Sequence, residues 1–333
     1  MPRSRNFRLT TTAILLGILI FPGLFLGAQE EAGIYLLHAP ESAEQGDPLF
    51  AWIESPIPLG DLSLGLLGKD GKLLSKGGGF FLSSSVEPAF YQYGFLLPVP
   101  MDSKGGRGRL ELTAQIPSNS ETLKVAKDFE ITTKKFLQEE IPLDRTNSLI
   151  RTAPDPAKTA QAISFAALFG QRDLTALHFP GVLSRPLKGE WRQTSFFGDR
   201  RTYLYSGGGS DTSIHQGIDL GARAGTPVFA CAPGKVVFAD LRIVTGNTIV
   251  LEHLPGFFSI YMHLSGMRVA AGDRVAQDQE IGTVGSTGLS TGPHLHWELR
   301  IGNVPVNPHY WLERPVLDKD PVSGRIKPPA EGR

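Results

Sequence analysis

The sequence predicts a mainly β protein of more than one domain, and three observations point to this fold class. The 333 residues include 38 glycines and 25 prolines, a composition typical of many turns and short strands rather than of a helical bundle. Short runs of strand-forming residues recur along most of the chain, separated by turn signals such as KDGK, KGGG and DSKGG. Only the segment AKTAQAISFAALF shows a clear helical spacing of apolar residues.

Charge and cysteine content restrict the function classes. The 33 lysines and arginines balance the 33 aspartates and glutamates, so the chain lacks the positive field that draws a protein to nucleic acid or to acidic lipid. A single cysteine excludes an internal disulfide, so stability must come from the hydrophobic core. Alternation in its strand predicts that Cys231 is a small buried residue rather than a nucleophile.

The N-terminus, residues 1–28, has the layout of a secretory signal peptide. Arg3, Arg5 and Arg8 precede an apolar run, and Ala28 occupies a plausible cleavage position. An uncleaved anchor is the alternative, although the apolar run is shorter than the roughly 20 residues that span a bilayer. We therefore expect an exported protein of the periplasm or cell envelope, either released or anchored by this segment.

The remaining chain divides into four parts by residue composition and by its strand and helix patterns. Residues 30–133 contain runs such as PLFAWIES, YQYGFLLPVP and GRLELTAQI, whose spacing predicts an immunoglobulin-like β-sandwich domain. Residues 134–188 are expected to be a linker with one helix, which starts after Asp155-Pro156. Residues 189–314 are glycine-punctuated β structure, and residues 315–333 form a polar, proline-rich tail expected to be disordered.

The segment TGPHLHWELR places two histidines two positions apart in a run of strand formers. In a strand, such residues point to the same face, so His294 and His296 project from one side while Leu295 and Trp297 project from the other. Two imidazoles on one face can bind a metal, can act as a base and its neighbour, or can lie on a polar surface. The alternation alone leaves these three interpretations open.

Two further segments add candidate residues. IHQGIDLG supplies His215 and Asp219, and IYMHLS supplies His263. The glycine inside HQGID and its β-rich flanks favour a bent strand or loop over a helical turn. Imidazoles with a carboxylate typify zinc sites, and a catalytic zinc uses three protein ligands and a water. Counted with His294 and His296, five candidates exceed that need, and spare histidines favour a hydrolase over a structural zinc site.

Residues 191–313 resemble the lysostaphin-type (LytM-like) zinc endopeptidases, which hydrolyse peptide cross-links of peptidoglycan. The resemblance is carried by SFFGDR, HQGID, GTPVFACAPGKVVFAD, GNTIVLEH, YMHLS, VGSTGLSTGPHLHWELR and VPVNP, in the order of the family. It implies that residues 189–314 form an antiparallel β-sheet peptidase domain of this type.

The resemblance also implies a role for each candidate residue. His215, Asp219 and His296 would bind one zinc ion per chain. His294 would be the general base for the water that the zinc activates, and His263 would help to stabilise the transition state. The substrate would be the peptide stems of peptidoglycan during cell-wall remodelling, and no nucleic-acid partner is expected.

Several alternatives stay open at this point. The scissile bond is either the link between D-alanine and a diamino acid or a glycine bridge. Some relatives have lost zinc ligands and act as non-catalytic activators of other wall hydrolases, whereas this chain keeps all five positions. The N-terminal β domain can bind an envelope protein partner. The sequence does not identify this partner. It also leaves open whether the linker inhibits the peptidase and which oligomeric state the protein adopts.

Overall fold

The computed structural model describes residues 35–87, 89–178 and 181–318. The predicted signal peptide lies outside the described residues, as does the tail beyond residue 318. Pro315 still pairs with Val182 and Val316 is buried, so described structure continues past the expected domain end at residue 314. Within the described ranges, no helix is both long enough and apolar enough to cross a membrane.

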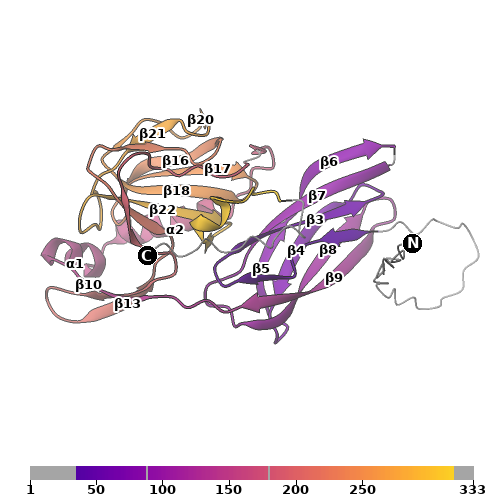
Figure 1. The fold of residues 1–333 in the computed structure, drawn as a ribbon, viewed down its shortest axis with the longest axis horizontal. Coiled ribbons are helices and arrows are strands. Elements are labelled where there is room, and N and C mark those ends of the chain that lie inside the picture. Colours follow the sequence, from indigo (N-terminus) through magenta and orange to yellow (C-terminus); the bar gives the residue numbers. More distant parts are fainter. Residues whose placement is uncertain (1–34, 88, 179–180, 319–333) are drawn as a thin grey trace, which may run out of the picture. The chain divides into compact units, whose positions relative to one another are not determined.

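The first part of the described chain contains two sheets that share one hydrophobic core. One sheet has the order β1-β3-β7-β6 and the other the order β2-β9-β8-β4-β5 (Figure 1). The strands are β1 (Leu36–His38), β2 (Ser42–Glu44), β3 (Pro48–Ser55), β4 (Gly60–Leu67), β5 (Leu73–Gly78), β6 (Phe80–Val86), β7 (Ala89–Pro98), β8 (Gly106–Ile116) and β9 (Glu121–Thr132). Leu49 and Ile53 of β3 and Phe95 of β7 are fully buried in this core. An immunoglobulin-like topology remains a prediction.

The sequence predicted a turn at KGGG, and this prediction is wrong, because β5 continues through most of the segment to Gly78. The reason is a close backbone approach: a Cβ added to Gly77 would lie 2.5 Å from the carbonyl oxygen of Leu96. Glycine is therefore needed for contact between chain segments and not for reversal of the chain.

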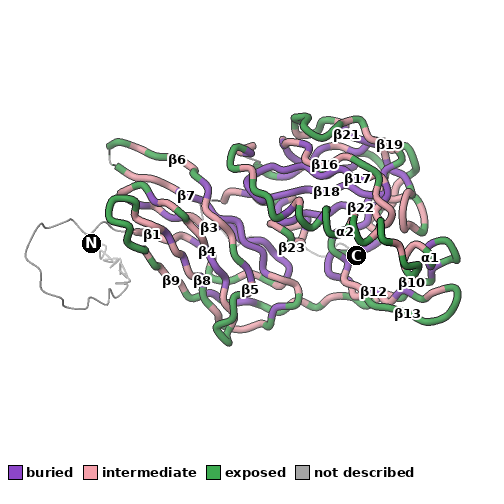
Figure 2. The backbone as a smooth tube through the Cα atoms, turned by 180° about the vertical axis from the view of Figure 1, so that it is seen from behind, coloured by how far each residue is buried: buried purple, intermediate pink, exposed green. Residues whose placement is uncertain are grey.

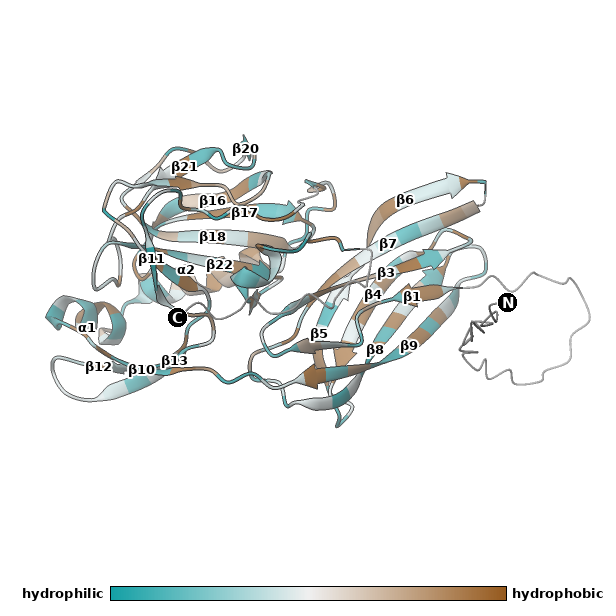
Figure 3. Ribbon diagram, in the orientation of Figure 1, coloured by the Kyte–Doolittle hydropathy of each residue, from teal (hydrophilic) through white to brown (hydrophobic). Residues whose placement is uncertain are grey.

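The segment after β9 contains β10 (Gln138–Pro142) and two helices, α1 (Arg145–Thr152) and α2 (Pro156–Leu168). The sequence predicted only α2, which begins after the Asp155 cap as expected. The additional helix α1 is mostly hydrophilic (Figure 3) and begins where the Asp144 carboxylate accepts the backbone N–H of Asn147 at 2.7 Å. An eight-residue polar helix has no apolar periodicity by which it could be recognised.

An antiparallel sheet with the order β11-β14-β22-β18-β17-β16-β20 dominates the last part of the chain, with β23 beside β22. Smaller sheets, β10-β12-β13 and β15-β21-β19, flank it. The strands are β11 (Arg192–Ser195), β12 (Arg200–Leu204), β13 (Ser210–Ile214), β14 (Ile218–Gly221), β15 (Pro227–Phe229), β16 (Gly234–Arg242), β17 (Gly246–Leu254), β18 (Phe257–Leu264), β19 (Gly266–Met267), β20 (Arg274–Val275), β21 (Glu280–Thr283), β22 (His294–Ile301) and β23 (Val304–Val306), followed by a 3-10 turn, Pro308–Trp311.

The main core covers one face of this large sheet and helix α2 covers part of the other, and β18 is buried along its whole length (Figure 2). Leu295 and Trp297 of β22 point into the main core, where neither is exposed. On the opposite face, α2 packs Phe165 against Phe238 of β16, in an edge-to-face ring contact. Helix α2 thus covers part of the face from which the histidines of β22 project, and the rest of that face is left for the candidate site.

Candidate functional site

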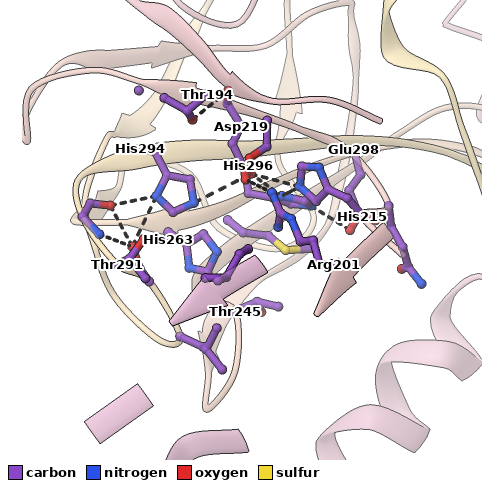
Figure 4. Close-up of a pocket in the computed structure, with 18 of the residues that line it drawn as sticks. Thr194, Arg201, His215, Asp219, Thr245, His263, Thr291, His294, His296 and Glu298 are labelled. Atoms are coloured by element: carbon purple, nitrogen blue, oxygen red, sulfur yellow. Dashed lines mark hydrogen bonds and ion pairs between the residues drawn. The ribbon is translucent and has the colours of Figure 1, made fainter. Parts of the chain in front are cut away.

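The alternation of β22 carries the predicted histidines onto the face opposite Leu295 and Trp297. Antiparallel pairing places Asp219 of β14 directly across from His296. His215 lies in the bend before β14, and His263 lies near the end of β18, which is the other neighbour of β22. The structure therefore brings all five candidate residues together around one point (Figure 4).

Three of these residues form a compact group of metal-ligand atoms. His215 Nε2 lies 3.2 Å from Asp219 Oδ1 and 3.0 Å from His296 Nδ1. The distance from His296 Nδ1 to Asp219 Oδ1 is 2.7 Å. All three residues are buried and can hold a metal ion between them.

Hydrogen bonds on the outer sides of the two rings fix their orientation. His215 Nδ1 lies 2.7 Å from the carbonyl oxygen of Phe196, and this ring nitrogen must donate because a carbonyl only accepts. His296 Nε2 donates to Glu298 Oε1 at 2.9 Å. The other nitrogen of each ring therefore faces Asp219. Two imidazole nitrogens and a carboxylate oxygen suit zinc, with a further coordination position left for water or substrate.

The electrostatics of the group favour a bound cation. Burial raises the pKa of Asp219, but hydrogen bonds from His215 and His296 outweigh burial and hold it well below its ordinary value. Burial lowers the pKa of His215, which favours the neutral ring that a metal requires. Burial also lowers the pKa of His296, but Asp219 and Glu298 outweigh this and raise it to about 9. A metal ion at His296 Nδ1 thus displaces the proton that faces Asp219, while the Nε2 proton stays with Glu298.

His294 and His263 line the same cleft beside the metal-ligand group. His294 Nδ1 donates to the carbonyl oxygen of Gly292 at 2.8 Å, and its Nε2 lies 3.8 Å from Asp219 Oδ1. The ring centroids of His263 and His294 are 4.8 Å apart. The neutral His294 ring therefore presents a lone pair at Nε2, on the side of the metal-ligand group.

His263 is held in an unusual backbone conformation. Its φ of 62° lies in the left-handed region, which few residues other than glycine adopt. Its Nδ1 donates to the carbonyl oxygen of Thr287 at 2.8 Å, so the neutral ring presents a lone pair at Nε2. Burial, with smaller effects of His294 and His296, lowers the pKa of His263 to about 3. The ring is neutral at ordinary pH, and backbone strain of this kind is common at functional sites.

Sequence reasoning missed a chain of buried polar groups behind His296. Glu298 Oε2 accepts from Arg300 Nε at 2.7 Å, and Arg300 Nη1 donates to Asn303 Oδ1 at 3.1 Å. Burial raises the pKa of Glu298, but Arg300 and His296 outweigh it and lower the pKa to about 2. The sequence contains a signal for these two residues, because Glu298 and Arg300 continue the period-two alternation that begins with His294.

Arg201 is a second residue that the sequence did not single out. Its Nη2 donates to Asp219 Oδ2 at 2.6 Å, and its Nε lies 3.5 Å from Glu139 Oε2. The SFFGDR motif ends at Arg200, one residue before this contact. Asp219 therefore directs one oxygen to the metal-ligand group and the other to a guanidinium.

The site opens into a cleft of about 1510 Å³ that the preceding linker helps to build. Strand β10 pairs in parallel with β12, and Glu139 and Leu143 line the cleft. The side-chain amide of Asn147 in α1 donates to the backbone carbonyl of Ser290 and accepts its N–H, at 3.1 and 3.2 Å. Residues 138–152 are thus a wall of the cleft rather than a loose connection.

Two other residues are part of the core and not of the site. Cys231 is fully buried, and burial raises the pKa of its thiol to about 11, in agreement with the predicted inert role. His253 donates from Nδ1 to the carbonyl oxygen of Pro233 at 2.7 Å, and its Nε2 lies 2.8 Å from Ser259 Oγ. Neither residue lines the cleft.

Comparison with known proteins identifies the family of this part of the chain. Residues 213–308 match the model of Peptidase family M23. The chain contains an M23 peptidase domain. This finding confirms the family resemblance drawn from the sequence motifs, and the matched range holds all five candidate residues of the cleft.

Curated relatives share the M23 domain with this chain. The DD-carboxypeptidase/endopeptidase Mpg of Neisseria meningitidis is 47% identical over 95 residues, which are 28% of this chain and 22% of that protein. The peptidoglycan DD-endopeptidase ShyA of Vibrio cholerae is 37% identical over 122 residues, or 37% of this chain and 28% of ShyA. The chain thus matches only about a quarter of the length of these relatives.

A solved structure supports the fold over a longer range. A crystal structure of a peptidase M23 from Pseudomonas aeruginosa covers 77% of this chain and 95% of that chain, with a TM-score of 0.51 and 22% identity. At this identity the similarity concerns the fold alone. The mainly β architecture expected from the sequence is therefore confirmed, with an M23-type peptidase domain.

Proposed function

We propose that this protein is a zinc-dependent endopeptidase that hydrolyses peptide cross-links of bacterial peptidoglycan. One observation carries the proposal: two imidazole nitrogens and one carboxylate oxygen converge at 2.7–3.2 Å in a cleft that two further histidines line. A closed structural site would use four protein ligands, whereas three leave a position for chemistry. The names of the M23 relatives support peptidoglycan as the substrate.

In this proposal His215, Asp219 and His296 hold the zinc ion. When bound, the ion polarises the scissile carbonyl and lowers the pKa of a water molecule. Glu298 keeps the proton of His296 on Nε2, so that Nδ1 stays available as a ligand. Arg201 holds the second oxygen of Asp219 and fixes the orientation of the carboxylate.

His294 is the proposed general base. Its Nδ1 proton is held by the carbonyl of Gly292, so Nε2 is free to accept a proton from the attacking water. After attack, the same nitrogen can deliver this proton to the leaving amine. The tautomer that the backbone imposes is therefore the one that a base at this position needs.

His263 supports the same step as a hydrogen-bond acceptor. The expected role was stabilisation of the transition state, yet a neutral His263 with its proton on Nδ1 has no N–H to give an oxyanion. Its Nε2 can instead accept the second hydrogen of the attacking water. We propose that His263 orients this water, and that its low pKa of about 3 prevents it from competing with His294 for the proton.

We also propose that the protein acts in the cell envelope, because residues 1–28 have the composition of an export signal. The substrate lies in that compartment. Of the two candidate bonds, the names of the DD-endopeptidase relatives favour the bond to a diamino acid over a glycine bridge.

Digestion of purified peptidoglycan tests the proposal. The zinc-loaded protein is incubated with intact sacculi, and the released fragments are identified by mass spectrometry. We expect new peptide ends at cross-links from wild type and none from His294→Ala. If zinc-loaded wild type releases no fragment, the enzyme proposal is wrong, and a non-catalytic role as an activator of other wall hydrolases becomes the better account.

A further inference from the structure

One residue from each of three neighbouring strands forms a row across the site face of the sheet. Arg192 of β11 lies opposite Gly221 of β14, and Gly221 lies opposite His294 of β22. Residues directly opposite each other in a sheet point to the same face, so the Arg192 side chain shares the face of His294. A Cβ added to Gly221 would lie 3.7 Å from Arg192 Cγ, which agrees with this direction.

Gly221 contributes no side chain to this row, and the Thr194 Cγ2 methyl lies 2.9 Å from the place where a Cβ of Gly221 would be. Antiparallel neighbours have Cα atoms about 4.5–5.5 Å apart, so the Cα atoms of Arg192 and His294 are roughly 10 Å apart. An extended peptide advances about 3.3–3.6 Å per residue. A substrate group that meets Arg192 is therefore about three residues from the scissile amide.

Two arginines that line the cleft have no charged partner among the described residues. Arg192 and Arg223 both line the cleft, and among the residues that the structure describes neither guanidinium has an ion pair or a hydrogen bond. Other arginines of the cleft are engaged: Arg151 with Asp211, Arg201 with Asp219 and Arg300 with Glu298.

Two further charged residues, Lys188 and Glu190, line the same cleft. Lys188 pairs with Asp278 at 3.2 Å, whereas Glu190 has no ion pair in the described ranges. Glu140 also lines the cleft without an ion pair in the described ranges, so the two free carboxylates equal the two free guanidinium groups in number, and selectivity must come from the guanidinium groups themselves. A planar guanidinium also binds a carboxylate through two parallel hydrogen bonds, which an ordinary amide cannot replace at equal strength.

We propose that Arg192, together with Arg223, which follows Gly221 by two residues, forms a subsite that binds a carboxylate of the substrate peptide, about three residues from the bond that is cut. This inference rests on the proposed peptidase function and specifies the substrate as an anionic peptide. The subsite selects a free carboxylate against the same group in amidated form.

The test uses two synthetic cross-linked peptides that differ only in one carboxylate, which is free in one peptide and converted to a primary amide in the other. This group lies about three residues from the scissile bond. We measure kcat/KM of the zinc-loaded full chain for both peptides and take the ratio of acid to amide. Since a hydrogen bond to a charged group is worth about 1.5–3 kcal/mol, we expect the wild-type ratio to be about tenfold or more.

Arg192→Gln and Arg223→Gln should each move this ratio toward one. The matched control is Arg274→Gln, because Arg274 is exposed on β20, at the opposite edge of the same sheet. The control should keep the wild-type ratio. Zinc content and thermal unfolding of each variant show whether the fold and the metal site are intact.

Each other outcome has a distinct meaning. Equal hydrolysis of the two peptides by wild type overturns the subsite and leaves the peptidase function standing. An unchanged ratio in both Arg192→Gln and Arg223→Gln also overturns it, even where their rates fall, because a purely structural role lowers both rates alike. Hydrolysis of neither peptide contradicts the proposed function itself, and the subsite with it.

Discussion

Glu298 Oε1 lies 2.9 Å from His296 Nε2, on the side of the ring that faces away from Asp219. Through this contact the carboxylate keeps a proton on Nε2, so that Nδ1 is the nitrogen left for a metal ion. Arg300 and His296 hold the carboxylate in its ionised form. Glu298 is thus a positioning residue that acts on the proposed metal ion through His296.

Glu298→Gln keeps the shape of the side chain and removes its charge. Loss of such a partner typically weakens metal binding about 10–100-fold, and we expect a loss in this range. Competition with a chelator of known zinc affinity measures the effect, and Glu280→Gln, an acid of β21 outside the cleft, is the control. Unchanged zinc affinity in Glu298→Gln would show that the contact is not needed for binding.

The backbone near His263 offers a second test. Gly246 has a φ of +64°, and a Cβ at this position would lie 2.1 Å from Thr287 Oγ1. The carbonyl of Thr287 holds His263 Nδ1, so a displaced Thr287 disturbs the His263 ring. Gly246→Ala should cost about 2–5 kcal/mol, the sum of left-handed strain and overpacking.

Gly302→Ala is the matched control for Gly246→Ala. Gly302 has a φ of +54° with no atom within 4 Å of an added Cβ, so only the strain of about 1–2 kcal/mol applies. Urea unfolding measures both variants. An equal loss of unfolding free energy in both variants would show that Thr287 moves without cost and does not fix the position of His263.

The alternation in HLHWELR shows how far the sequence could be followed. Period-two spacing predicted one face for His294 and His296 and a packed face for Leu295 and Trp297, which the structure places in the main core. One more step of the same rule leads to Glu298, and a second leads to Arg300. The alternation in β22 therefore predicts every polar side chain on the site face of this strand, including Glu298 and Arg300, which were not singled out.

Other parts of the site depend on contacts between segments that no local pattern connects. Arg201 meets Asp219 because the β12 segment lies beside the start of β14, and pairing of distant strands leaves no periodic signal. Helix α1 is short and polar, and its place in the cleft wall depends on the Asn147 amide and the backbone of Ser290. Such features follow from tertiary packing, which overrides local propensity.

Stability should depend on pH through His253. Burial lowers the pKa of His253 to about 4, below the ordinary value of 6.5. The unfolded chain then binds a proton as the pH falls below 6.5, while the folded chain stays neutral until near pH 4. The contribution of His253 to the free energy of unfolding is complete above pH 6.5. It is lost progressively as the pH falls from 6.5 through 4, and about 2–3 kcal/mol is lost by pH 4.5.

Urea unfolding of the wild type and of His253→Asn at pH 7.5, 6.0, 5.0 and 4.5, in the presence of chelator, checks this linkage. The difference in unfolding free energy between the two proteins should shrink by that amount between pH 7.5 and pH 4.5. Other titrating groups are common to both proteins and cancel. A difference that stays constant over this range would mean that His253 does not titrate on unfolding.

The central claim is the division of labour between the two histidines of HLH, and one comparison tests it most directly. Zinc content and hydrolysis of peptidoglycan are measured on the same samples of wild type, His294→Ala and His296→Ala. We predict that His294→Ala retains one zinc ion per chain and loses hydrolysis by about 100-fold or more, as expected for a missing general base. His296→Ala should lose both zinc and hydrolysis. Loss of zinc from His294→Ala, with zinc retained in His296→Ala, would contradict the assignment of the two roles.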